Sequence, residues 1–127
     1  MKCKSFLVLL SLGICLSGYG AGQSCKINGS TDGSSIMVTS DYLSDNVINA
    51  VLDNDSKEEC ANVSVEVEVV YKCGYSAETR SYTGFGKSCP GSSTTVKIPI
   101  QKTFNIKSNV YDFQSYRVIS ISGSKCN

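Results

Sequence analysis

The densest group of potential ligand side chains in the 127-residue sequence is the acidic stretch Asp53–Glu59 (DNDSKEE). Carboxylate and amide oxygens are the ligands that Ca²⁺ prefers, and at this density they could hold such an ion. The stretch lacks the glycine and the ligand spacing of an EF-hand loop, however, and Lys57 lies in its middle. Its composition is typical of a solvated turn between two strands. We therefore predict neither a metal site nor a cofactor site.

A second pair of carboxylates, Glu66 and Glu68, would lie side by side on one face of a strand because the two residues are two positions apart. Paired carboxylates can hydrolyse glycosidic bonds, but the sequence contains no Trp to form a platform for a sugar ring. An outward acidic face that keeps a sheet soluble accounts better for the spacing. The sequence also contains no His, which excludes Ser-His-Asp and Cys-His nucleophiles. We predict that the protein is not an enzyme.

Residues 1–22 are predicted to form a secretory signal peptide. Lys2 and Lys4 supply a positive start, and an apolar run (FLVLLSLGICL) leads to small residues that end at Gly22. The run is well short of the roughly 20 residues that a membrane-spanning helix needs. The bulky Ile14 before Cys15 is unfavourable for lipoprotein processing. We expect an exported chain without a membrane span, secreted or, in a bacterium, periplasmic.

Residues 23–127 are expected to form a single domain. The sequence is 41% hydrophobic, which is enough for a packed core. Without Lys2 and Lys4 the chain has 10 Lys and Arg against 11 Asp and Glu. No basic surface therefore points to a nucleic-acid partner.

The clearest periodicity lies at residues 63–73 (VSVEVEVVYKC), where valines alternate with polar residues. This pattern predicts a strand half-buried in an antiparallel sheet. Similar patterns predict strands over residues 35–40, 80–85, 94–101 and 114–122. Pro99 places 94–101 at a sheet edge or a bulge. Both faces of 114–122 are apolar, so its inner face stays open.

The stretch 45–53 (DNVINAVLD) fits two structures. As a strand it would turn Ile48, Ala50 and Leu52 inward, and as a helix it would present a stripe that includes Leu43 and Val47. A strand is favoured, because a helix this short has little stability of its own. Six or seven short strands joined by Gly, Ser, Asn and Asp turns predict an all-β antiparallel sandwich.

Five cysteines remain after the leader, and in an exported domain they are expected to form disulfides. If 63–73 and 80–85 pair across the turn after Cys73, then Cys60 and Cys89 meet at the open end of that hairpin. Cys25 and Cys126 lie near the two mature ends, which are often close together. We predict the pairs Cys60–Cys89 and Cys25–Cys126. Cys73 is left as a free thiol that could form a covalent dimer.

Two further groups of residues bear on function. Tyr75, Tyr82 and Phe85 lie near the same predicted hairpin and could form a binding patch, since exposed tyrosines favour recognition. Three N-x-S sequons, at Asn28, Asn54 and Asn62, could carry glycans in a eukaryotic host.

The order of four segments resembles the bacterial FxLYD-type immunoglobulin-like domains. The segments are Asn49–Ser56 (NAVLDNDS), Asn62–Val69 (NVSVEVEV), Pro90–Ile100 (PGSSTTVKIPI) and Ser115–Ser122 (SYRVISIS). The motif that names the family is replaced here by a run of valines before Tyr71. The resemblance implies an immunoglobulin-like sandwich of about seven strands and a non-catalytic module. Cys25, Cys126 and the segment Tyr116–Ile119 also resemble small secreted ribonuclease-like fungal effectors, which would imply an α+β fold with a helix over 45–53.

These observations predict a secreted, non-enzymatic protein that binds a protein or a glycan outside the cytoplasm. The alternative is a host-directed effector or inhibitor with a catalytically dead ribonuclease-like fold. Circular dichroism separates the two, because only the second contains a helix.

Overall fold

The structure, a computed structural model, describes residues 23–31 and 33–126. The predicted leader lies outside these residues. The described part of the chain contains eight strands and no helix. They are β1 (Ser24–Lys26), β2 (Ser35–Ser44), β3 (Val47–Asn54), β4 (Ala61–Cys73), β5 (Ser76–Ser88), β6 (Thr94–Pro99), β7 (Thr103–Ile106) and β8 (Asn109–Lys125). No helix in residues 23–31 or 33–126 could therefore cross a membrane.

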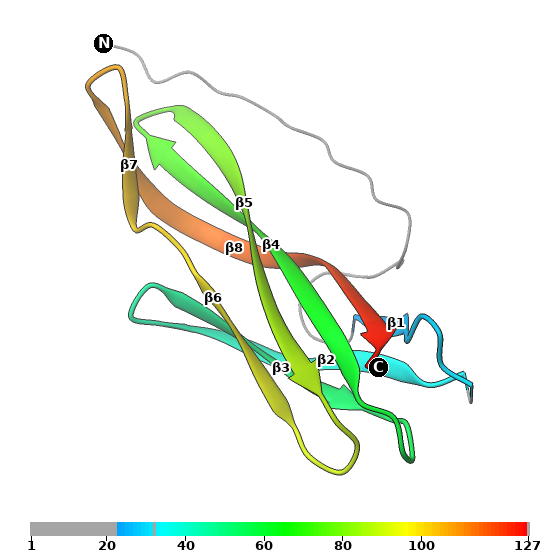
Figure 1. Cartoon of the computed structure of the whole chain (residues 1–127). Helices are drawn as coiled ribbons and strands as arrows, with labels where there is room; N and C mark the ends of the chain where they lie inside the picture. Colours follow the sequence, from blue (N-terminus) through cyan, green and yellow to red (C-terminus); the bar gives the residue numbers. More distant parts are fainter. Residues whose placement is uncertain (1–22, 32, 127) are drawn as a thin grey trace.

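The strands form two four-stranded antiparallel sheets, in the orders β1-β2-β3-β6 and β5-β4-β8-β7. The sheets pack against each other around one hydrophobic core, which confirms the all-β sandwich (Figure 1). The third strand stays in the first sheet, whereas the third strand of an immunoglobulin domain belongs to the second. The tips of the β4–β5 and β7–β8 hairpins project past the β2–β3 turn (Figure 1).

Strand β4 forms the centre of the molecule, because it pairs along nearly its whole length with β5 on one side and β8 on the other. Its odd-numbered residues from Val63 to Tyr71 are at most 3% exposed and line the core. Glu66 and Glu68 lie on the outer face, where Ser120 donates a hydrogen bond to Glu66 and Arg117 forms an ion pair with Glu68. The predicted half-buried strand is therefore confirmed, and its acidic face points outward.

The ambiguous stretch 45–53 is a strand. Ile48, Ala50 and Leu52 are fully buried, as the strand prediction requires. Asp45 and Asn46 form the β2–β3 turn with φ values of 50° and 62°, which a two-residue hairpin of type I′ needs. The alternative helix, and with it the α+β ribonuclease-like fold, is wrong because alternate side chains enter the core.

Strand β8 owes its two apolar faces to a bulge. Val67 pairs with Val118 while Glu66 pairs with Ser120, so β8 carries one extra residue at this point. Val118 and Ile121 are consequently both buried although they are three positions apart. Pro99 ends β6, which is an edge strand as predicted.

A hydrogen bond between half-buried side chains joins the two sheets. The Tyr116 hydroxyl on β8 donates to Asp41 Oδ1 on β2 over 2.7 Å. Burial and the neighbouring Asp41 carboxylate raise the pKa of Tyr116. The hydroxyl therefore stays protonated and keeps donating across the physiological pH range.

The disulfide predictions are confirmed in one case and wrong in the others. Cys60 and Cys89 are bonded, with their Cα atoms 4.1 Å apart, because Ala61 and Ser88 are direct partners in the β4–β5 ladder. Closing a loop of this size stabilises the fold by about 3–4 kcal/mol in the chain-entropy model. Cys25 is disulfide-bonded as predicted, but Cys126 is free, so the predicted Cys25–Cys126 pair does not form.

The geometry explains both corrections. Cys25 is buried on the inner face of β1, whereas Cys126 lies on the outer face and its thiol donates to Asn62 Oδ1. Cys73 is disulfide-bonded and is not a free thiol. It ends β4 on the inward side and packs against the core, not on an exposed turn. The structure gives no support to a covalent dimer through Cys73.

We expect Val65→Asp to abolish secretion of folded protein and Glu66→Lys to leave it unchanged. Val65 is fully buried, and an unpaired buried carboxylate costs several kcal/mol. This cost is comparable to the roughly 5–15 kcal/mol that stabilises a small domain. Secreted yield and near-UV circular dichroism of the two variants measure the difference. Equal tolerance at both positions would contradict the assigned faces of β4.

Candidate binding cleft

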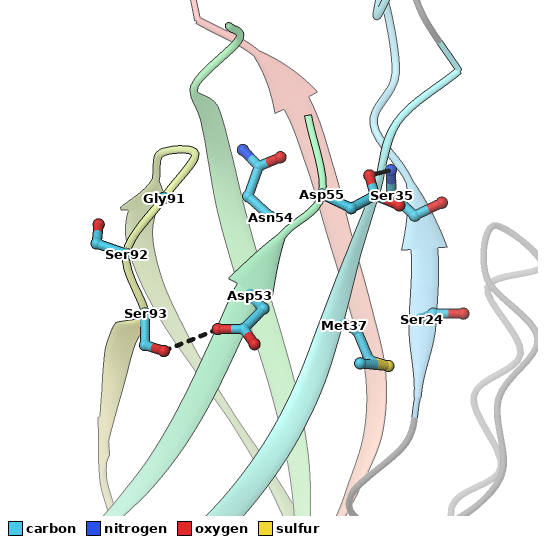
Figure 2. A pocket seen from close by; sticks show the side chains of 9 residues that line it. All are labelled: Ser24, Ser35, Met37, Asp53, Asn54, Asp55, Gly91, Ser92 and Ser93. Atoms are coloured by element: carbon cyan, nitrogen blue, oxygen red, sulfur yellow. Dashed lines mark hydrogen bonds between the residues drawn. The ribbon is translucent and has the colours of Figure 1, made fainter. Parts of the chain in front are cut away.

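An open cleft of about 760 Å³ lies at one end of the sheet β1-β2-β3-β6 (Figure 2). It is bounded by the ends of three strands and by the turn between β5 and β6. The lining residues are Ser24, Ser35, Met37, Asp53, Asn54, Asp55, Gly91, Ser92 and Ser93.

The register of three strands builds the floor of the cleft. Ser24 on β1 is the partner of Met37 on β2, and Met37 is the partner of Asp53 on β3. These three residues form a row across the outer face of the sheet, where Met37 is 43% exposed. An apolar thioether therefore stands between a hydroxyl and a carboxylate.

Hydrogen bonds fix the walls of the cleft (Figure 2). Ser93 in the β5–β6 turn donates from its hydroxyl to Asp53 Oδ1 over 2.8 Å, which ties the turn to β3. Asp55 Oδ1 accepts from the backbone N–H of Ser35 over 2.6 Å, which ties the end of β3 to β2. Each carboxylate has a second oxygen that is not used in these bonds.

Asn54 lies between these two acids, and its side chain is buried in the interior. Its Nδ2 donates to the carbonyls of Glu59 and Ser88, and its Oδ1 accepts from the N–H of Ser56. The amide thus connects the loop after β3 to the end of β5, next to Cys60–Cys89. The position of Asp53 and Asp55 in the cleft is set by this anchor.

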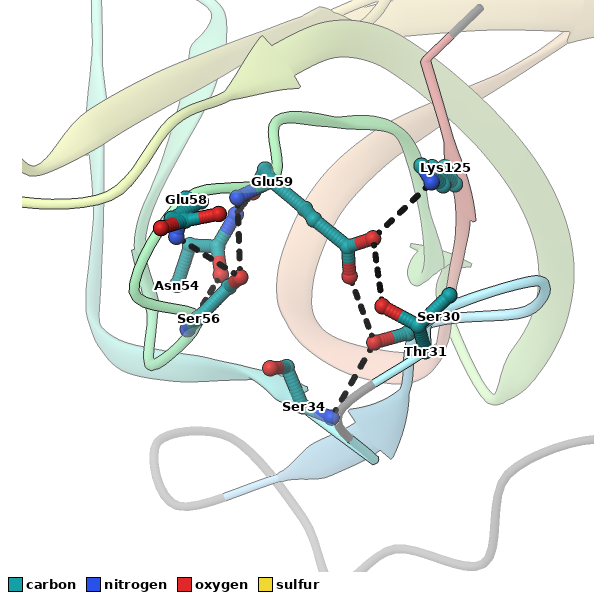
Figure 3. A network of polar contacts seen from close by, with 8 residues as sticks. All are labelled: Ser30, Thr31, Ser34, Asn54, Ser56, Glu58, Glu59 and Lys125. Atoms are coloured by element: carbon teal, nitrogen blue, oxygen red, sulfur yellow. Dashed lines mark hydrogen bonds and ion pairs between the residues drawn. The ribbon is translucent and has the colours of Figure 1, made fainter.

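The acidic stretch Asp53–Glu59 divides its side chains between separate partners. Glu59 points away from the cleft and accepts hydrogen bonds from Ser30 and Thr31, and it pairs with Lys125 over 3.0 Å (Figure 3). The hydrogen bond from Ser30 and the neighbouring Lys125 lower the pKa of Glu59. The carboxylates therefore do not converge, and no cluster of three potential metal ligands occurs in the part of the chain that the structure describes.

The predicted patch of Tyr75, Tyr82 and Phe85 does not form. Tyr75 occupies the β4–β5 turn and is fully exposed, while Phe85 lies far along β5 from that turn and is 76% exposed. Tyr82 points inward and shares a hydrogen bond with the Tyr71 hydroxyl. The odd spacing of Tyr82 and Phe85 already places them on opposite faces of a strand.

Most residues of the cleft have no local signal in the sequence. Ser24, Met37 and Ser93 are far apart along the chain and meet only through the pairing of β1, β2 and β3 and the return of the β5–β6 turn. Asp53 and Asp55 belong to the acidic stretch that the sequence singled out, although for metal binding. No protein-family model, curated protein or solved structure matches the chain.

Burial distinguishes Asn54 from the asparagines of the other two sequons. Asn28 and Asn62 are exposed, whereas both Nδ2 hydrogens of Asn54 are used inside the protein. We expect protein secreted from a eukaryotic host to carry glycans at Asn28 or Asn62 and none at Asn54. Peptide mapping after enzymatic deglycosylation measures the occupancy of each site. Recovery of a peptide glycosylated at Asn54 from folded secreted protein would show that the Asn54 side chain does not form these internal hydrogen bonds.

The Glu59 contacts predict a pH dependence of stability. A carboxyl with a lowered pKa in the folded state stabilises the fold above its unfolded pKa of about 4.3. That contribution is lost as the pH falls through the lower folded pKa. Urea unfolding at pH 6 and pH 3 should therefore show a difference between wild type and Glu59→Gln that shrinks at low pH. Glu58→Gln is the matched control, and a pH-independent effect of Glu59→Gln would contradict the assignment.

Proposed function

We propose that the chain is an exported, non-enzymatic binding protein whose cleft takes a glycan or a similar hydroxyl-rich ligand. The observation that carries this proposal is the cleft itself, with its row of Ser24, Met37 and Asp53 across three strands. Carboxylate and hydroxyl groups form hydrogen bonds with sugar hydroxyls, and the Met37 side chain offers an apolar contact for the ring carbons. The volume of the cleft lies in the range of small-molecule sites.

The charge of the cleft narrows the class of ligand. Asp53 and Asp55 are the only charged residues among those that line it. A sialic acid or a uronic acid would meet two carboxylates, so neutral sugars and amino sugars are favoured. Asp53 is the sharper determinant because Asp55 also accepts a backbone hydrogen bond that holds the fold.

The proposed location rests on the disulfide and on the sequence. The Cys60–Cys89 bridge fits an oxidising compartment, where such bonds persist. The predicted signal peptide over residues 1–22 points to the same compartment. The immunoglobulin-like relationship stays a prediction, and it favours a binding module over an enzyme.

A panel of immobilised oligosaccharides tests the proposal. We expect neutral or amino sugars to bind and acidic ones not to bind. Asp53→Asn should weaken binding about tenfold or more, since a hydrogen bond to a charged group contributes about 1.5–3 kcal/mol. Asp112→Asn, an exposed position on β8 outside the cleft, is the matched control and should bind as wild type.

Three outcomes would overturn the proposal. Binding of acidic sugars alone would contradict the charge argument, and equal effects of Asp53→Asn and Asp112→Asn would move the site elsewhere. Mass spectrometry of the ligand after incubation detects any cleavage of the oligosaccharide. Cleavage would show that the protein is an enzyme. Circular dichroism first verifies that each protein variant is folded.

A further inference from the structure

Strand β5 leaves part of its backbone edge open. It is the outermost strand of its sheet, and within the described residues it pairs only with β4. From Gly84 onward β6, which belongs to the other sheet, packs across the inner face of β5: a Cβ at Gly84 would lie 2.5 Å from Ile98 Cγ1 and 2.8 Å from the carbonyl oxygen of Lys97. Along the half Ser76–Thr83, as along the rest of this outer edge, no strand of residues 23–31 or 33–126 pairs with β5 on the side away from β4.

A hollow of about 450 Å³ lies against this half of β5. Its lining consists of the consecutive residues Glu78–Tyr82 and of Gln101. Gln101 belongs to the link that leaves β6 for β7, on the other edge of the sheet. The Tyr71 hydroxyl donates to the Gln101 carbonyl over 2.6 Å and holds this link in place. The hollow beside this edge is therefore bounded by a link that a hydrogen bond holds in a fixed position.

Alternate residues of an edge strand direct their N–H and C=O groups outward. Such an edge is a template for a further strand, and proteins commonly protect it with charges. Residues 76–83 contain two charges of opposite sign, Glu78 and Arg80, two positions apart and thus on one face. The Arg80 guanidinium is held 3.9 Å from the centre of the Phe104 ring.

These charges are self-complementary in one register. If two copies of the strand pair antiparallel about Thr79, Glu78 of each copy lies opposite Arg80 of the other. Opposite charges in directly facing positions stabilise strand pairing, and like charges destabilise it. Any shifted register removes both of these contacts.

We propose that a second copy of this chain binds here, through antiparallel pairing of the Ser76–Tyr82 segments about Thr79. Pairing joins the two β5-β4-β8-β7 sheets into one eight-stranded sheet. The contact is short compared with stable dimer interfaces, so association is reversible and depends on concentration. The proposal is independent of the cleft, which lies on the other sheet.

Sedimentation velocity over a range of protein concentrations tests the proposal, with Cys126 alkylated so that covalent dimers do not contribute. We expect a reversible dimer for wild type. Glu78→Arg alone and Arg80→Glu alone each place like charges opposite each other at both contacts, and each should weaken dimerisation about tenfold or more. Lys87→Glu, an exposed position on β5 outside the Ser76–Tyr82 segment, is the matched control and should dimerise as wild type.

Mixing the two single variants separates pairing from misfolding. The Glu78→Arg chain carries two arginines on this face and the Arg80→Glu chain carries two glutamates, so opposite charges face each other at both contacts of a mixed pair. The mixture should therefore recover the dimer that neither variant forms alone. A wild type that stays monomeric throughout would show that Glu78 and Arg80 only protect the edge.

If the mixture fails to dimerise, the two strands do not pair in the register that places Glu78 opposite Arg80. The Asp53→Asn variant should dimerise normally whether or not a glycan binds in the cleft. The test of dimerisation through β5 is therefore independent of the test of glycan binding.

Discussion

The structure depends on the burial of one continuous apolar face, the odd-numbered side of β4. This face runs from Val63 to Tyr71 without a polar interruption and is buried in the hydrophobic core. Because side chains alternate along a strand, burial of this face also fixes the exposure of Glu66 and Glu68. The ladders to β5 and β8 then inherit their faces from β4, since partners in a ladder share a side of the sheet. A one-residue shift in either ladder would turn its side chains to the wrong face.

The unequal extent of the two sheets determines which surfaces are available for binding. Where β6 lies against β5, glycines replace larger residues: Gly84 and Gly86 both face Val96. Beyond that crossing the chain leaves β6 and passes Tyr71 on its way to β7, so within the part of the chain that the structure describes no strand pairs with the free side of the β4–β5 hairpin tip. The cleft arises at the opposite end, where the short β1 and the β5–β6 turn border the ends of β2 and β3. The cleft, next to the turn after β5, and the hollow against residues 78–82 thus lie near opposite ends of β5.

Local patterns in the sequence predicted the strands and one disulfide, because both follow from alternation and hairpin register. Cys60 and Cys89 could be paired from the positions of two strands alone. The inner face of β8 could not be predicted, since a bulge at Val118–Ser120 changes the alternation, and nothing local marks that bulge. The Cys25–Cys126 prediction placed the two ends correctly near each other: Asn28 pairs with Ser124. It was wrong about the faces from which the two thiols project.

The cleft could not be derived from the sequence because its residues meet only through tertiary contacts, yet its rigidity has a local origin. The turn that forms its wall begins directly after Cys89, and the disulfide fixes that point to the start of β4. Asn54, between the two cleft acids, donates to the carbonyl of Ser88, the residue before Cys89. Ser93 then closes the turn onto Asp53. A site held in this way loses little conformational entropy when a ligand binds, which favours affinity from few contacts. The polar groups of the acidic stretch therefore serve two purposes: those that point inward hold the framework, and those that point outward remain for a ligand.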